Sequence, residues 1–91
     1  MKVRTYNMAE LCEAIEKAHG KIVEAFRLEY PTDPRCAWSL RINVKCENWD
    51  MSWAPAEKEE NVKELLGRDD IVGFEWRRYS DKILQIVTRE E

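Results

Sequence analysis

Apolar and polar residues alternate most clearly over residues 36–47, where every second position is apolar. The apolar set is Cys36, Trp38, Leu40, Ile42, Val44 and Cys46. Because successive side chains of a strand point to opposite faces of a sheet, this pattern predicts a half-buried strand. Residues 21–30 alternate in the same way, with Glu24 as the exception. The turn-forming segment 31–35 lies between the two, so we predict a β-hairpin.

An earlier segment follows the helical period instead, with Met8, Leu11, Cys12 and Ile15 three or four residues apart. Asn7 is a good N-cap, and Glu10 three residues later completes a capping box. Gly20 can take the left-handed conformation that ends such a helix. We therefore predict a helix over 8–19. A helical continuation through 21–30 is the alternative to a strand there, and Gly20 favours the strand.

The pattern in the second half of the chain predicts one more helix and a second hairpin. Residues 49–54 are expected to form a loop, and Pro55 is placed in the first turn of a helix that ends at Gly67. Two strands over 71–79 and 82–89 follow, and a short strand is expected over 2–6.

The predicted order β-α-β-β-α-β-β defines an α+β fold. We expect a single domain over 1–91, with two helices packed on one face of a mostly antiparallel sheet of four to five strands. This order of elements resembles a ferredoxin-like arrangement with an added strand, and that fold hosts many unrelated activities. In the first hairpin, we expect Leu28 opposite Trp38, Phe26 opposite Leu40, and Ile22 opposite Val44. The expected core is Leu11, Ile15, Phe26, Trp38, Leu40, Ile42, Phe74, Trp76, Leu84 and Ile86.

Composition narrows the class of protein. Of the 91 residues, 36% are charged and 44% are hydrophobic, which is enough apolar surface for one folded core. No apolar run approaches the roughly 18 residues that a membrane span requires. The basic residues near the N-terminus are not followed by the apolar stretch of a secretory signal. We therefore expect a cytoplasmic protein, either of the cell that makes it or of a host.

Little in the chain indicates catalytic chemistry. The three cysteines, Cys12, Cys36 and Cys46, form no Cys-x-x-Cys pair, and they are best interpreted as small buried hydrophobic residues. On the predicted helix, Cys12 and the single histidine, His19, are separated by about 10 Å, too far to share a metal ion. No nucleotide-binding or hydrolase motif occurs. We predict a non-enzymatic protein without cofactor or metal, and a small enzyme without a recognisable motif is the third alternative.

Charge is distributed unevenly along the chain. Residues 1–45 hold eight basic and six acidic residues, whereas residues 46–91 hold seven basic and twelve acidic residues, so the net charge of -3 arises in the second half. Most of the acidity falls between Glu47 and Asp70. An acidic surface of this kind favours approach to a basic protein surface.

Two tryptophans in this acidic segment indicate where a partner would bind, because tryptophan is frequent among the residues that dominate interface energetics. We predict a partner-binding set of Trp49, Asp50, Trp53, Glu57, Glu59, Glu60 and Glu64. The two tryptophans are either interface anchors or lids packed over the core. The predicted function is a small protein-binding module, an inhibitor or adaptor of the kind that phages and bacteria encode, and its partner is another protein with a basic surface.

Two alternative partners follow from other residues. The outward positions of the sheet would carry Arg27, Arg41, Lys45, Arg77, Tyr79 and Arg89, a set suited to RNA or single-stranded DNA. Glu29, Glu47 and Glu75 fall on the same face, and the net negative charge opposes this interpretation. The last strand is apolar on both faces, so a homodimer through Ile83 and Val87 is the other alternative.

Overall fold

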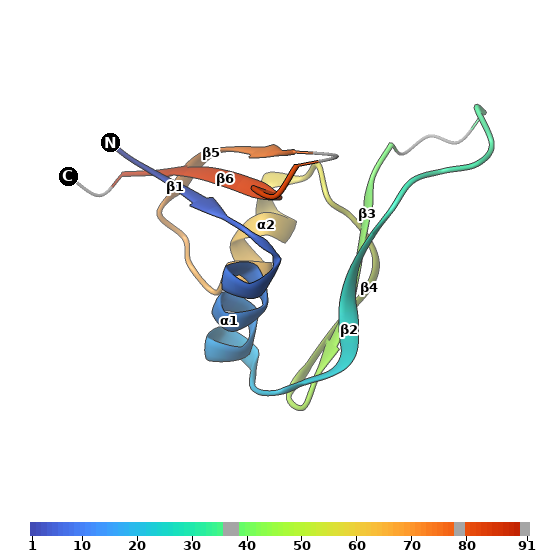
Figure 1. Ribbon diagram of the computed structural model, residues 1–91, viewed down its shortest axis with the longest axis horizontal. Coiled ribbons are helices and arrows are strands. Elements are labelled where there is room, and N and C mark those ends of the chain that lie inside the picture. Colours follow the sequence, from blue (N-terminus) through green and yellow to red (C-terminus); the bar gives the residue numbers. More distant parts are fainter. Residues whose placement is uncertain (36–38, 78–79, 90–91) are drawn as a thin grey trace.

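The computed structural model describes residues 1–35, 39–77 and 80–89, and the strands within these ranges form two antiparallel sheets of three strands. One sheet has the order β1-β6-β5, formed by Lys2–Tyr6, Leu84–Thr88 and Ile71–Trp76; the other has the order β2-β3-β4, formed by Ile22–Glu29, Arg41–Cys46 and Trp49–Pro55. The helices α1 (Met8–His19) and α2 (Glu59–Leu66) lie in the angle between the two sheets (Figure 1).

The α+β class and the antiparallel pairing are confirmed, but the expectation of one sheet with both helices on one face is wrong. The ferredoxin-like order is not confirmed, because residues 49–54, expected to be a loop, belong to β4. This strand turns back after Glu47 and Asn48 and pairs with β3, placing Met51 opposite Val44 in the core. Strand β4 therefore completes a second sheet.

Several boundaries differ from the predicted ones. Pro55 ends β4 instead of opening a helix, and α2 begins at Glu59. Strand β3 begins at Arg41, because Ser39 and Leu40 are not in strand conformation and residues 36–38 lie outside the described residues. The helix over 8–19 is confirmed, with its Asn7–Glu10 capping box, as are the hairpin strands on either side of the 31–35 turn and in the C-terminal third.

The register of the first hairpin differs from the expected one by four residues at Leu28 and by two at Ile22, and Glu24 between the two bulges is shifted by three. Leu28 lies opposite Ile42, and Ile22 opposite Cys46, with two bulges between them in β2. Because side chains alternate with a period of two, the even shifts at Leu28 and Ile22 keep these two side chains packed against the core. The expected partner Trp38 lies outside the described residues.

The core fills the space between the sheets and the helices. Of the expected core residues, Leu11, Ile15, Phe26, Leu40, Ile42, Leu84 and Ile86 are buried, and Phe74 and Trp76 pack against them half-buried. The buried residues outside the expected core come mainly from β4, α2 and the strand ends, namely Tyr6, Met51, Ala56, Val62, Leu65, Leu66 and Ile71. Val44 and Cys46, which the alternation placed on the apolar face, are buried as well. Within the described ranges, no helix is long and apolar enough to span a membrane.

Candidate protein interface

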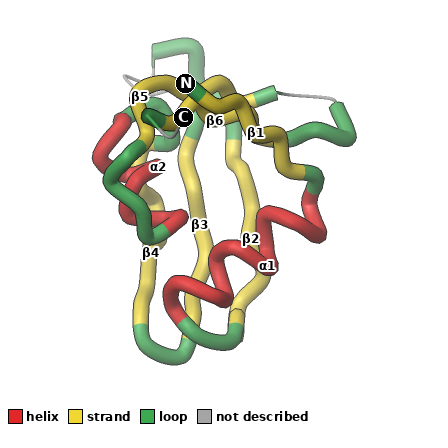
Figure 2. Tube along the Cα trace, turned by 90° about the vertical axis from the view of Figure 1, so that its left-hand side faces the viewer, coloured by secondary structure: helices red, strands yellow, loops and turns green. Residues whose placement is uncertain are grey.

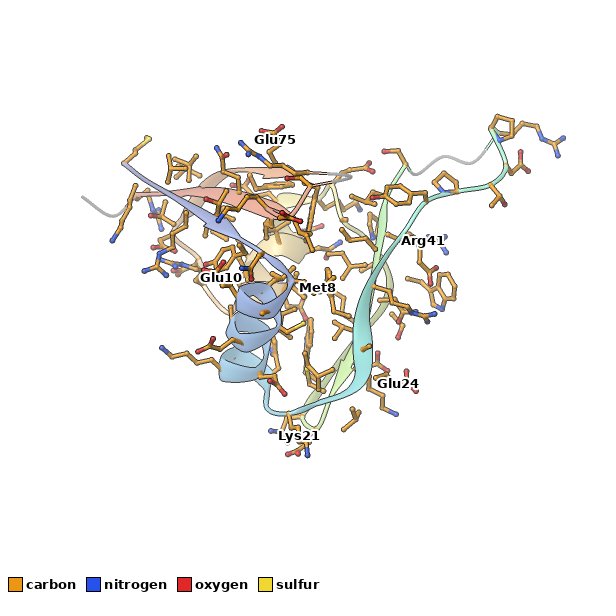
Figure 3. The ribbon with its side chains drawn as sticks, in the orientation of Figure 1. Met8, Glu10, Lys21, Glu24, Arg41 and Glu75 are labelled. Carbon is orange, nitrogen blue, oxygen red and sulfur yellow. The ribbon has the colours of Figure 1, made fainter. Side chains whose placement is uncertain are left out.

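In the described ranges no helix covers the outer face of the β2-β3-β4 sheet, because both helices lie on its other side (Figure 2). Along β3, the apolar side chains Ile42, Val44 and Cys46 are buried towards the helices. Arg41 and Lys45 alternate with them and project outward. In Figure 3 the Arg41 and Glu24 side chains point away from α1. We call this outer surface the open face.

Charges on the open face alternate in sign across the strands. Lys45 has Glu24 as its neighbour on β2 and Asp50 as its neighbour on β4. Directly opposed residues of unlike charge stabilise a sheet, by roughly 0.2–1 kcal/mol per pair. Towards the other end of the strands, Arg41 lies opposite Glu29, whose carboxylate is 3.7 Å from the Arg27 guanidinium. The open face is therefore highly charged but balanced.

Trp53 is the unusual residue of the open face. A bulge in β4 places both Ser52 and Trp53 between the paired positions Met51 and Ala54, and Trp53 takes a left-handed backbone conformation with φ of 63°. Its side chain is 55% exposed, and the Arg41 guanidinium lies 5.4 Å from the ring centroid. Left-handed conformation costs a residue with a Cβ roughly 1–2 kcal/mol, and burial of this side chain does not compensate for it.

Trp49, by contrast, is a lid over the core. Its ring stacks on His19 at 3.8 Å between centroids and 11° between planes, and its indole N–H donates to Glu64 Oε1 at 2.9 Å. His19 Nε2 donates in turn to the Glu64 carbonyl at 2.7 Å. These contacts tie the ends of both helices to β4. Of the two roles considered for the tryptophans, lid and interface anchor, Trp49 has the role of a lid over the core. Trp53 is exposed and is not a lid.

The predicted acidic set does not form one patch. Asp50 lies on the open face near Trp53 and accepts a hydrogen bond from Ser52 at 2.7 Å. The other acidic members belong to α2 and the turn before it: Glu57 accepts from Ser39, Glu59 lies 3.8 Å from Lys63, Glu60 is exposed, and Glu64 holds Trp49. Only Asp50 and Trp53 of the predicted set share the open face.

The residues of the nucleic-acid alternative are divided between the two sheets. Arg27, Arg41 and Lys45 lie on the β2-β3-β4 sheet, whereas Arg77 follows β5 and bonds to Gln85, and Arg89 follows β6 and donates to the Asp69 carbonyl. Tyr79 lies outside the described residues. Glu47 lies in the turn before β4, and Glu75 projects from β5 (Figure 3). No single sheet face therefore carries the whole basic set among the described residues.

Dimerisation through the last strand is restricted by the fold. Strand β6 is central in its sheet, with β1 paired to one edge and β5 to the other. Ile83 packs against the core, and Val87 is half-buried between Val3 and Gly73 on the neighbouring strands. A dimer through β6 itself would have to use the outer face of the sheet, because both edges of β6 are already paired.

The two thiols in the described part of the chain, Cys12 and Cys46, have raised pKa values. Burial raises the pKa of Cys46, and the carboxylates of Glu16 and Glu47 raise it further. The pKa of Cys12 is raised by burial and by Glu16. A thiol with a raised pKa is protonated and unreactive at neutral pH. Among the described residues, no group of three or more histidine, cysteine, aspartate or glutamate side chains is placed to hold a metal ion.

Comparison with known proteins adds no assignment: no family model matches the chain, and neither the curated proteins nor the solved structures contain a match. Arg41 is the residue of the open face beside Trp53 that sequence reasoning left out of the protein-binding set. Its position beside Trp53 follows from the pairing of β3 with β4. If residues 49–55 had been predicted as a strand paired with β3, Arg41 and Trp53 would have been expected close together.

Proposed function

We propose that this chain is a small, non-enzymatic protein-binding domain that uses the open face, centred on Trp53 and Arg41. The observation that supports the proposal is the strained, exposed conformation of Trp53, which the core does not require. Backbone strain of this kind concentrates at functional positions. Tryptophan and arginine are also the residues most enriched among interface hot spots. The domain would act as an inhibitor or adaptor, by occupying a surface of its partner.

The charges and the exposed tryptophan of the open face indicate which kind of partner surface would fit it. The charges of the open face alternate in sign across Glu24, Lys45 and Asp50. A partner surface with the complementary order of charges would fix the relative position of the two proteins, and a partner with another order would be repelled. An apolar pocket on the partner would receive the Trp53 ring. The net charge of -3 would add long-range attraction to a partner that is basic overall. Free thiols at Cys12 and Cys46 support a reducing compartment, so we propose the cytoplasm as the place of action.

Affinity capture with matched variants tests the proposal. Tagged wild-type protein, Trp53→Ala and Val72→Ala are incubated with extract of the native host, with and without nuclease. Val72 is the control, because its side chain is 41% exposed on the other sheet. We expect the wild-type protein to capture one host protein in a stoichiometric amount, with or without nuclease. Trp53→Ala should abolish this capture, and Val72→Ala should leave it unchanged. Capture that nuclease abolishes, or that Trp53→Ala leaves unchanged, would contradict the proposal.

A further inference from the structure

A second surface, separate from the open face, forms a cleft of about 600 Å³ between β1, α1 and the segment that follows α2. Figure 2 views the molecule from the side on which α1 and this segment lie, with the β2-β3-β4 sheet behind them. The two helices approach so closely here that a Cβ on Gly67 would lie 2.7 Å from the Ala18 Cβ. Such packing makes the wall of the cleft a fixed part of the fold.

Three cationic side chains from three different segments line the cleft, namely Arg4 of β1, Lys17 of α1 and Arg68. Arg68 is held in place by Asp70, through Nε to Oδ1 and Nη2 to Oδ2, both at 2.7 Å. Hydrogen bonding to Asp70 raises the pKa of Arg68, and a bond to the Tyr6 hydroxyl adds to the effect. This guanidinium is therefore a permanently charged, positioned group in the cleft wall.

Arg4 and Lys17 differ from Arg68, because neither forms an ion pair with any residue in the described ranges. Two positive charges without an ion-pair partner among the described residues, contributed to one cleft by β1 and by α1, match the two negative charges of a phosphate group. Arginine supplies a planar fork for phosphate oxygens, and lysine supplies a point charge. The exposed carboxylate of Asp69 also lines the cleft. It would repel a bare anion but can accept hydrogen bonds from hydroxyl groups.

We propose that this cleft binds a phosphorylated small molecule that carries hydroxyl groups, with the phosphate held between Arg4 and Lys17. The cleft volume lies within the range of small-molecule sites. The hydroxyl groups of the ligand donate to Asp69, which is why a hydroxylated phosphate ester binds more tightly than inorganic phosphate does.

Amide chemical-shift titration with ribose 5-phosphate, inorganic phosphate and acetate at constant ionic strength tests this site. We expect saturable shifts at Arg4 and at residues 67–70 with both phosphates, at concentrations up to ~10 mM, and none with acetate. Arg4→Gln and Lys17→Gln should each weaken binding roughly tenfold, since hydrogen bonds to charged groups are among the strongest. Lys58→Gln removes the same charge from a residue outside the cleft lining and should leave affinity unchanged.

Three results would overturn the proposal. One is the absence of saturable shifts with either phosphate. Another is equal weakening by Lys58→Gln and by the two cleft variants, which would show unspecific attraction by overall charge. The third is tighter binding of inorganic phosphate than of ribose 5-phosphate, which would remove the role assigned to Asp69. None of these results concerns Trp53, so the proposed function is tested independently.

Discussion

Trp53 gives the sharpest test of strain on the open face, because glycine and alanine at this position separate backbone strain from side-chain contacts. Both substitutions remove the ring and its contact with Arg41, which lies 5.4 Å from the ring centroid. Only glycine removes the Cβ, and at φ of 63° a Cβ costs roughly 1–2 kcal/mol. Glycine also gives the unfolded chain more freedom, which subtracts about 0.5–1 kcal/mol. Trp53→Gly should therefore be more stable than Trp53→Ala by ~0.5–1 kcal/mol.

Equilibrium unfolding in urea, monitored by far-UV circular dichroism, measures this difference. The two variants should have the same m-value, and the midpoint of Trp53→Gly should lie higher. A thermal scan provides an independent readout, with Trp53→Gly melting about 2–8 °C above Trp53→Ala for a domain of this size. If Trp53→Ala is as stable as Trp53→Gly, the residue is not strained and the main support for the proposed function is removed. Both variants should lose partner binding equally, because both lack the ring.

Three further predictions concern contacts that hold the fold. Trp49→Ala should lower the free energy of unfolding by about 2 kcal/mol, less than for a fully buried tryptophan, and an unchanged urea midpoint would show that Trp49 is not a lid. Gly67→Ala should cost more than ~1 kcal/mol, because the added Cβ would meet Ala18 at a backbone φ of 63°; a stability equal to wild type would contradict the close helix approach. The hydrogen bonds from Arg68 lower the pKa of Asp70, so their stabilisation is present above the ordinary carboxyl pKa and is lost as pH falls through the lowered one. Asp70→Asn should therefore lose less stability than wild type on acidification below about pH 4, and parallel pH profiles would show that this pair does not contribute.

The elements that sequence analysis predicted correctly are those with local signals. The helix over 8–19 has a capping box at its start and Gly20 after its end, and both are short-range features of the chain. The register shift in the first hairpin shows the limit of such signals, since alternation assigns the core face but not the register or the bulges. The pairing of β1 with β6 joins the two ends of the chain and has no local signal.

Only part of the candidate site was predicted, because a bulge in β4 changes the face on which Trp53 lies. Strict alternation would place Trp49 and Trp53 on the same face of a strand, because they are four residues apart. The bulge at Ser52 and Trp53 reverses the alternation, so that Trp49 stacks on His19 while Trp53 lies under Arg41. A single residue in the left-handed conformation produces this reversal. Neither composition nor hydrophobic period indicates its position.

The most direct test of the proposed interface is hydrogen–deuterium exchange of the domain, alone and bound to the protein that wild type captures and Trp53→Ala does not. We expect slower exchange in the complex over 41–55, which covers β3, the turn after it and β4 with Trp53. Peptides from α2 and from the β1-β6-β5 sheet should exchange at the same rate in both states. Protection confined to 57–70, with 41–55 unchanged, would instead place the contact on the acidic helix and contradict the proposal that the open face binds the partner.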